Sequence, residues 1–142
     1  MTPAQLTTFR AAVQVNATIA AQRDAGDQGA VAAYYNSPDS GTIWRPDIST
    51  SELNTAIVWS EFAALTVALQ NTYMALISTT TIDATKANIR GGFTTVFSAG
   101  TTSRTNLTNL AQRVPTRFES LFTTSQVCSV YGQTVTASDT GV

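Results

Sequence analysis

The sequence predicts an all-α fold, mainly a helical bundle, with a short C-terminal strand or extended tail. Apolar residues recur at helical spacing along most of the chain, beginning with Leu6, Phe9 and Val13. Residues that favour helix N-termini, such as Asp27 and Ser49, precede several of these runs. After residue 124 the sequence becomes SQVCSVYGQTVTASDTGV, which is rich in β-branched residues. We therefore expect a helical core domain over 1–124 and a C-terminal extension over 125–142.

The first two helices are expected before residue 36. Thr2 can cap a helix whose first turn holds Pro3, and its apolar spacing continues to about Arg23. Asp27 can then cap a second, short helix over 28–35.

A loop should follow these helices, because NSPDSGTIWRPD contains two prolines and a glycine. Trp44 lies within this polar stretch. A large aromatic side chain in such a place usually anchors the loop to the core or to a partner.

The middle of the chain is expected to form a helix at the centre of the fold. Ser49 and Glu52 have the spacing of a capping box. The run VWSEFAALTVALQNTYMALI then predicts a helix over 58–77 that is apolar nearly all round, and so central to the fold or to an oligomer. We expect Trp59 to be buried, so that Trp59→Ala costs about 3–5 kcal/mol.

Two further helices are expected before the tail. Asp83 can cap a helix over 84–97, and Gly100 occupies the usual position beyond its last turn. A helix opening at 101–103 should continue to Phe122, with Pro115 kinking it near Gln112.

The pair Gly91-Gly92 raises the question of a phosphate-binding loop. No lysine follows the pair and no strand precedes it, and both are needed for such a loop. We interpret the glycines as positions in a helix that allow a bend or the close approach of a neighbour.

The composition favours a structural role over catalysis. Charged residues make up only 12% of the chain, the net charge is -1, and 25 residues are threonine. The chain has no histidine and one cysteine, Cys128, which we interpret as a small apolar core residue. We expect no enzyme activity, no cofactor and no metal site. The carboxylate pairs Asp24/Asp27 and Asp39/Asp47 are interpreted as turn and loop residues.

The chain also lacks the features of membrane and secreted proteins. No window approaches the roughly 18 apolar residues of a membrane span, and MTPAQLTTFR does not resemble a signal peptide. We expect no contact with a membrane, and a location in the cytoplasm or in an assembly made there.

Three arginines are the most informative charges. Arg113 and Arg117 are four residues apart, which would place them on one helix face, and Arg104 precedes them. They would contact phosphate or the acidic residues of a neighbour, or else form surface ion pairs, for example with Glu119.

Several stretches resemble a known family. NIRGGFTTVFSAGTTSRTNLTNLAQRVPTRFESLF, TPAQLTTFRAAVQ, GDQGAVAAYYNSP and the Trp44-Arg45 element are similar to segments of the head-to-tail connector (adaptor) proteins of tailed bacteriophages. The resemblance covers most of residues 2–123. The chain departs from the family's pattern at Pro46, and its tail is not matched.

The resemblance implies a helical subunit of a homo-oligomeric ring, with twelve copies expected, that docks below the portal protein and joins it to the tail or nozzle proteins. Such a ring lies at the head-tail interface of the virion and lines the DNA channel, where non-specific contact with DNA is possible. By analogy, the tail docks on the portal. Because the sequence changes from helical to β-like after Phe122, deleting 125–142 should leave the helical core folded but weaken attachment to the portal or a neighbour. The residues expected to bind partners are Trp44, Arg45, Arg104, Arg113, Arg117, Val127, Val130 and Tyr131.

Other functions remain open at this point. The chain could be another phage neck, tail or decoration protein, for which ring stoichiometry and the contacting partner would decide. A small helical nucleic-acid-binding regulatory module is a further alternative, which salt-dependent DNA binding would support.

Overall fold

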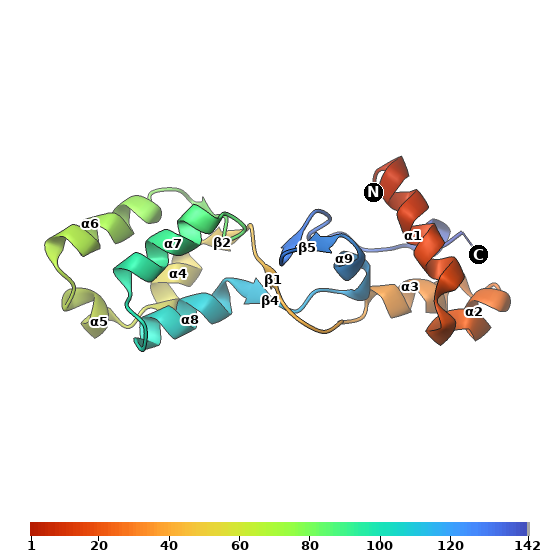
Figure 1. Ribbon diagram of the computed structural model, residues 1–142, viewed down its shortest axis with the longest axis horizontal. Helices are drawn as coiled ribbons and strands as arrows, with labels where there is room; N and C mark the ends of the chain where they lie inside the picture. The colour runs from red at the N-terminus through yellow and green to blue at the C-terminus, as the bar shows by residue number, and fades with distance from the viewer. Residues whose placement is uncertain (142) are drawn as a thin grey trace. The chain divides into compact units, whose positions relative to one another are not determined.

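A computed structural model describes residues 1–141, and over these residues the chain is mostly helical (56%). This confirms the predicted fold class. The helices are α1 (Pro3–Val15), α2 (Ala20–Asp24), α3 (Gln28–Asn36), α4 (Thr50–Ala56), α5 (Trp59–Ala63), α6 (Val67–Leu76), α7 (Ala87–Val96), α8 (Thr102–Leu110) and α9 (Arg117–Leu121) (Figure 1). Two short 3-10 helices are η1 (Ala17–Ile19) and η2 (Ala137–Asp139).

The strands are two residues long and form two-stranded pairs. β1 (Ile43–Trp44) pairs with β4 (Gln112–Arg113), β2 (Ile48–Ser49) with β3 (Thr81–Ile82), and β5 (Thr123–Thr124) with β6 (Val127–Cys128). The β2–β3 and β5–β6 pairs are antiparallel. The short strand expected in the tail is present as β6. Its hairpin turns at Ser125 and Gln126, which both have positive φ.

The chain forms two compact units. Unit 1 contains residues 1–43 together with the segment from Val114 onward, and unit 2 contains Trp44–Arg113. This division differs from the expected boundary at 124/125. The reason is that both ends of the chain contribute to one core, which a linear scan of the sequence does not reveal.

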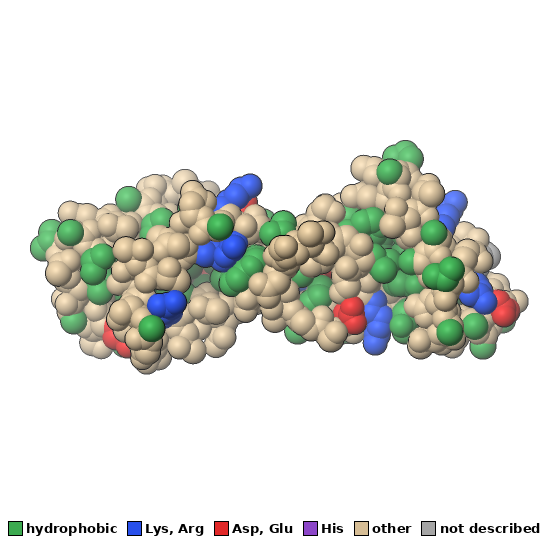
Figure 2. Space-filling view, viewed as in Figure 1, with side chains coloured by type: hydrophobic (Ala, Val, Ile, Leu, Met, Phe, Trp, Pro, Cys, Tyr) green, Lys and Arg blue, Asp and Glu red, His purple; other side chains and the backbone are tan. Residues whose placement is uncertain are grey.

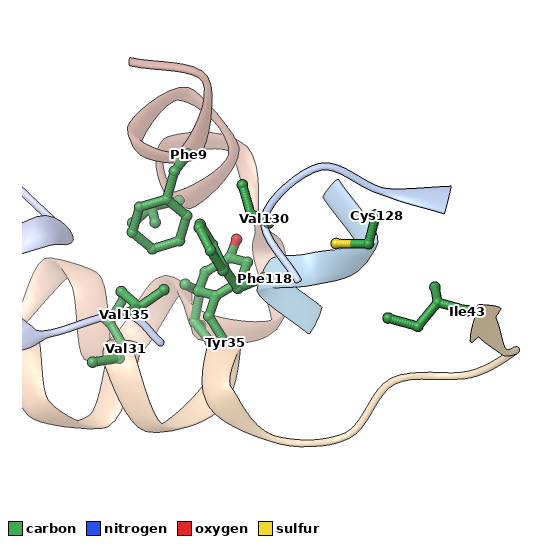
Figure 3. Packing of buried hydrophobic residues seen from close by; sticks show 11 residues of the cluster. Phe9, Val31, Tyr35, Ile43, Phe118, Cys128, Val130 and Val135 are labelled. Carbon is green, nitrogen blue, oxygen red and sulfur yellow. The ribbon is translucent and has the colours of Figure 1, made fainter. Parts of the chain in front are cut away.

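The core of unit 1 is built on aromatic side chains. The ring of Phe9 from α1 meets Tyr35 from α3 and Phe118 from α9 edge-on, with centroid distances of 4.9 and 5.4 Å. Figure 3 shows these three rings pointing toward one another, with Val130 and Val135 of the C-terminal segment beside them. The expected C-terminal extension is therefore part of this core.

Polar contacts also hold the C-terminal segment in place. Glu119 is buried in α9, and its carboxylate accepts hydrogen bonds from the backbone N–H of Thr116 (2.9 Å) and of Gly132 (2.7 Å). The side-chain amide of Asn36 donates to the carbonyl of Val135 and accepts from its N–H, both at 2.8 Å. Polar groups that are buried, as Glu119 is, or half-buried, as Asn36 is, are costly to leave without partners. The expectation that the core folds without this segment is therefore not supported.

The core of unit 2 surrounds Tyr73 of α6. Its buried ring packs against Phe62, Phe93 and Phe97, and its hydroxyl donates to Asn54 Oδ1 at 3.0 Å. Helices α6 and α7 lie side by side in Figure 1. A Cβ at Gly92 would stand 2.8 Å from a methyl carbon of Leu76. One glycine of the pair thus allows the close approach that the sequence predicted, and both lie inside α7.

Several predicted helix starts are confirmed. Asp27 caps α3, Ser49 and Glu52 form a capping box on α4, and Thr101 caps α8. Gly100 has a φ of +90° in the turn before α8.

Three predicted helices are broken. Asn16 ends α1 because its side chain accepts from the N–H of Thr18 and donates to the hydroxyl of Tyr35. The predicted 58–77 helix is interrupted at Thr66, whose extended backbone and hydroxyl cap a new helix, α6. The predicted 101–122 helix ends at Leu110, because a capping box of Thr116 and Glu119 starts α9 after Pro115.

Two smaller predictions also need correction. The helix expected from residue 84 begins at Ala87, since Asp83 instead holds a turn by accepting from Thr85. Trp59 is not buried: 56% of its surface is exposed. Because the chain breaks at Thr66, the apolar 58–77 run forms two helices, α5 and α6, instead of one. Trp59 lies in α5 and is at the surface.

Candidate interaction surface

Helices α5 and α6 present apolar side chains to solvent. Trp59 is 56% exposed, Val67 71% and Met74 56%. Val67 and Met74 are seven residues apart in α6 and so lie on one side of the helix. Hydrophobic side chains are visible over both helices in Figure 2. We call these three residues the α5–α6 face.

The α5–α6 face belongs to a segment almost without charge. Between Leu53 and Ile82 the only charged residue is Glu61. Its carboxylate accepts from the N–H groups of Thr102 (2.9 Å) and Ser103 (2.8 Å) at the start of α8. Hydrogen bonding by the Ser103 side chain, and then by the N–H groups of Ser103 and Thr102, lowers the pKa of Glu61. The one charge of the segment therefore stabilises a helix N-terminus. Large uncharged surfaces with Trp and Met are typical of protein interfaces.

Unit 1 carries a second, smaller apolar patch. Val15 at the end of α1 is 82% exposed and Leu121 at the end of α9 is 40% exposed. Both line one hollow, together with Tyr34 and Arg117. The guanidinium of Arg117 lies 4.5 Å from the centre of the Tyr34 ring, and its Nη1 donates to the hydroxyl of Ser37.

Arg45, expected to bind a partner, is engaged within unit 2. Its guanidinium pairs with Asp47 (3.3 Å) and Glu52 (3.0 Å) and donates to the carbonyl of Leu110 (3.3 Å). Its backbone N–H donates to Ala111 and its carbonyl accepts from Ala84, both at 2.9 Å. These contacts join α4, the end of α8 and the chain before α7. They favour a structural role for Arg45.

Trp44 and Arg104 both line a cavity of unit 2. Trp44 is half-buried, and the guanidinium of Arg90 lies 4.6 Å from the centre of its ring. The loop tryptophan is therefore anchored to its own unit.

The expectation that Arg113 and Arg117 share a helix face is wrong. Arg113 lies in β4 and Arg117 is the first residue of α9. Glu119, the acidic residue suggested as a surface partner for these arginines, is buried.

The three expected partner residues of the tail differ in exposure. Val127 is 39% exposed in β6, whereas Val130 is 1% exposed and belongs to the core of unit 1. Tyr131 is partly buried and packs against the same core. Val127 is the most exposed of the three. The sequence did not identify the residues of the α5–α6 face, but the 58–77 run, apolar nearly all round, left open a role at the centre of an oligomer.

We expect acid to weaken unit 2 through Glu52. Hydrogen bonds from the backbone and hydroxyl of Ser49, and then from Arg45, lower the pKa of Glu52 from 4.5 to about 2. A lowered folded-state pKa contributes stability above the ordinary pKa, and this stability is lost as the pH falls from about 4.5 to about 2. Both tryptophans lie in unit 2, so urea unfolding followed by tryptophan fluorescence reports this unit.

The matched variant is Glu52→Gln, which can still form a capping box. Its urea midpoint should fall less than that of the wild type over this pH range. If the urea midpoints of the two proteins fall equally with pH, Glu52 is not the cause of the acid destabilisation.

Within residues 1–141, no three His, Cys, Asp or Glu side chains come together as they would around a metal ion. No helix in this part of the chain has the length and hydropathy needed to cross a bilayer. Comparisons with protein-family models, curated proteins and solved structures found no match.

Proposed function

We propose that the chain is a structural subunit of the head-to-tail region of a tailed bacteriophage. In this role it is an adaptor that forms a ring below the portal, joins the portal to the tail and lines the DNA channel. The observation that carries the proposal is the α5–α6 face, where Trp59, Val67 and Met74 are exposed in a segment whose only charge is used internally. The resemblance of residues 2–123 to connector proteins supplies the particular role.

A ring also requires two different surfaces on each copy. Head-to-tail contacts join one patch of a subunit to another patch of the next, and they close into rings when the rotation allows. The α5–α6 face on unit 2 and the Val15/Leu121 patch on unit 1 are two such apolar surfaces. The proposal assigns the α5–α6 face to contact between copies.

We expect Met74→Glu to block assembly without unfolding the chain. Met74 is 56% exposed, so a carboxylate there remains hydrated in the monomer. In an interface the same carboxylate would be desolvated without a partner, which costs several kcal/mol. Sedimentation velocity over a range of concentrations should show oligomers for the wild type and a monomer for Met74→Glu. Tryptophan-fluorescence melting should be unchanged.

The matched control is Thr95→Glu, which adds the same charge to an exposed position on α7 that is not one of the three residues of the face. It should assemble as the wild type does. If Met74→Glu assembles as well as the control does, the α5–α6 face does not form the contact between copies.

A further inference from the structure

Unit 2 contains a cavity of about 90 Å³ between β2, α4, α7 and α8. Most of its walls are apolar, and they include Trp44, Ile48, Leu53, Ile89, Phe93 and Leu107. The volume lies between that of one water molecule and the roughly 150 Å³ of an apolar cavity that binds benzene. A short aliphatic group therefore matches it in size and polarity.

Two arginines line the same cavity, and no aspartate or glutamate does. Nη1 of Arg90 donates to the carbonyls of Ala84 (2.6 Å) and Thr85 (2.8 Å), and the guanidinium lies over the Trp44 ring. Arg90 is therefore held in place as a cation. Arg104 forms no ion pair with any acidic residue that the structure describes.

The acidic residues of unit 2 have other partners. Asp47 and Glu52 pair with Arg45, and Glu61 accepts from the start of α8. Asp83 accepts from Thr85 and pairs with Lys86. The positive charge at the cavity is thus not matched by a carboxylate of the same unit, and an anion from outside would complement it.

We propose that this cavity binds a small monocarboxylic acid with a short branched aliphatic group. The aliphatic group occupies the apolar interior, and the carboxylate faces Arg90 and Arg104. A guanidinium pairs with a carboxylate through parallel N–H···O bonds, which are among the stronger hydrogen bonds in proteins. This site is separate from the α5–α6 face, so either proposal can fail without the other.

The test is a titration of the full chain with 4-methylpentanoate, followed by amide chemical shifts. We expect saturable shifts concentrated in α7 and α8. The neutral 4-methylpentan-1-ol, acetate and inorganic phosphate should each bind at least about tenfold more weakly, because each lacks either the charge or the aliphatic group. Absence of saturation, or equal binding by any of the three, would overturn the proposal.

Variants locate the site. Arg104→Gln removes one cation, and Ala111→Leu fills the cavity from its wall; each should weaken binding at least about tenfold. Lys86→Gln removes the same charge from a side chain that is 65% exposed and outside the cavity, and it should bind as the wild type does. Tryptophan fluorescence checks folding, and if one cavity variant does not fold, the other decides. Unchanged binding in a folded cavity variant, or equal weakening in Lys86→Gln, would place the ligand elsewhere.

Discussion

A chain that ends at Thr124 is expected to lose the fold of unit 1 while unit 2 stays folded. The truncation removes Val130 and Val135 from the core, and it removes the Val135 partner of the half-buried Asn36 and the Gly132 partner of the buried Glu119. Each buried valine contributes about 1.5–3 kcal/mol, and each buried donor or acceptor that loses its hydrogen bond costs about 1–3 kcal/mol. The sum is of the same order as the roughly 5–15 kcal/mol that stabilises a whole domain.

Two spectroscopic signals separate the units in this experiment. Circular dichroism should lose the contribution of α1, α2, α3 and α9, whereas tryptophan fluorescence should still show the unfolding transition of unit 2. Val130→Ala and Val127→Ala are the matched pair, since the same atoms are removed from a buried and an exposed site. The first should cost about 1.5–3 kcal/mol and the second much less. A truncated chain with its full helical signal would show that the segment is only appended to the core.

Replacement of Tyr73 by alanine is expected to destabilise unit 2 by about 3–5 kcal/mol, as for other large buried aromatics. The ring is completely buried and touches three phenylalanines. Burial raises the pKa of Tyr73 to about 12, so its hydroxyl stays protonated and donates to Asn54 at neutral pH. Urea unfolding followed by tryptophan fluorescence measures the change.

Two further variants give this experiment its contrast. Tyr73→Phe keeps the ring and loses the hydrogen bond to Asn54, so it should cost only about 0.5–1.5 kcal/mol. Trp59→Ala should cost much less than Tyr73→Ala, because Trp59 is 56% exposed. This smaller cost replaces the about 3–5 kcal/mol that the sequence led us to expect for Trp59→Ala. A Trp59→Ala cost equal to that of Tyr73→Ala would place Trp59 in the core after all.

Local structure was predictable at several helix starts, where a capping side chain bonds the backbone a few residues later. The caps at Asp27, Ser49 and Thr101 depend on residues within three positions, and these are visible in the sequence. The breaks at Asn16 and Thr66 were missed because apolar spacing continues on both sides of each residue. A polar residue within such a run can lie on the exposed side of one continuous helix as readily as it can cap the start of a new helix.

Burial was less predictable, because it depends on contacts between distant parts of the chain. Trp59 and Val130 show this in opposite directions: the first was expected in the core and is exposed, and the second was expected at a partner and is buried. Val130 packs in a core with Phe9, more than a hundred residues earlier. No local pattern encodes that pairing, so neither unit 1 nor the α5–α6 face could be assigned from the sequence alone.

The proposed function requires the chain to form a ring and to bind a portal protein. Native mass spectrometry of the purified chain, alone and mixed with the portal ring of its proposed phage, tests both requirements in one experiment. We expect a ring-sized oligomer, or saturable loading of about one subunit per portal chain, and the loss of either with Met74→Glu. A lone 15.0 kDa monomer that does not bind the portal would contradict it.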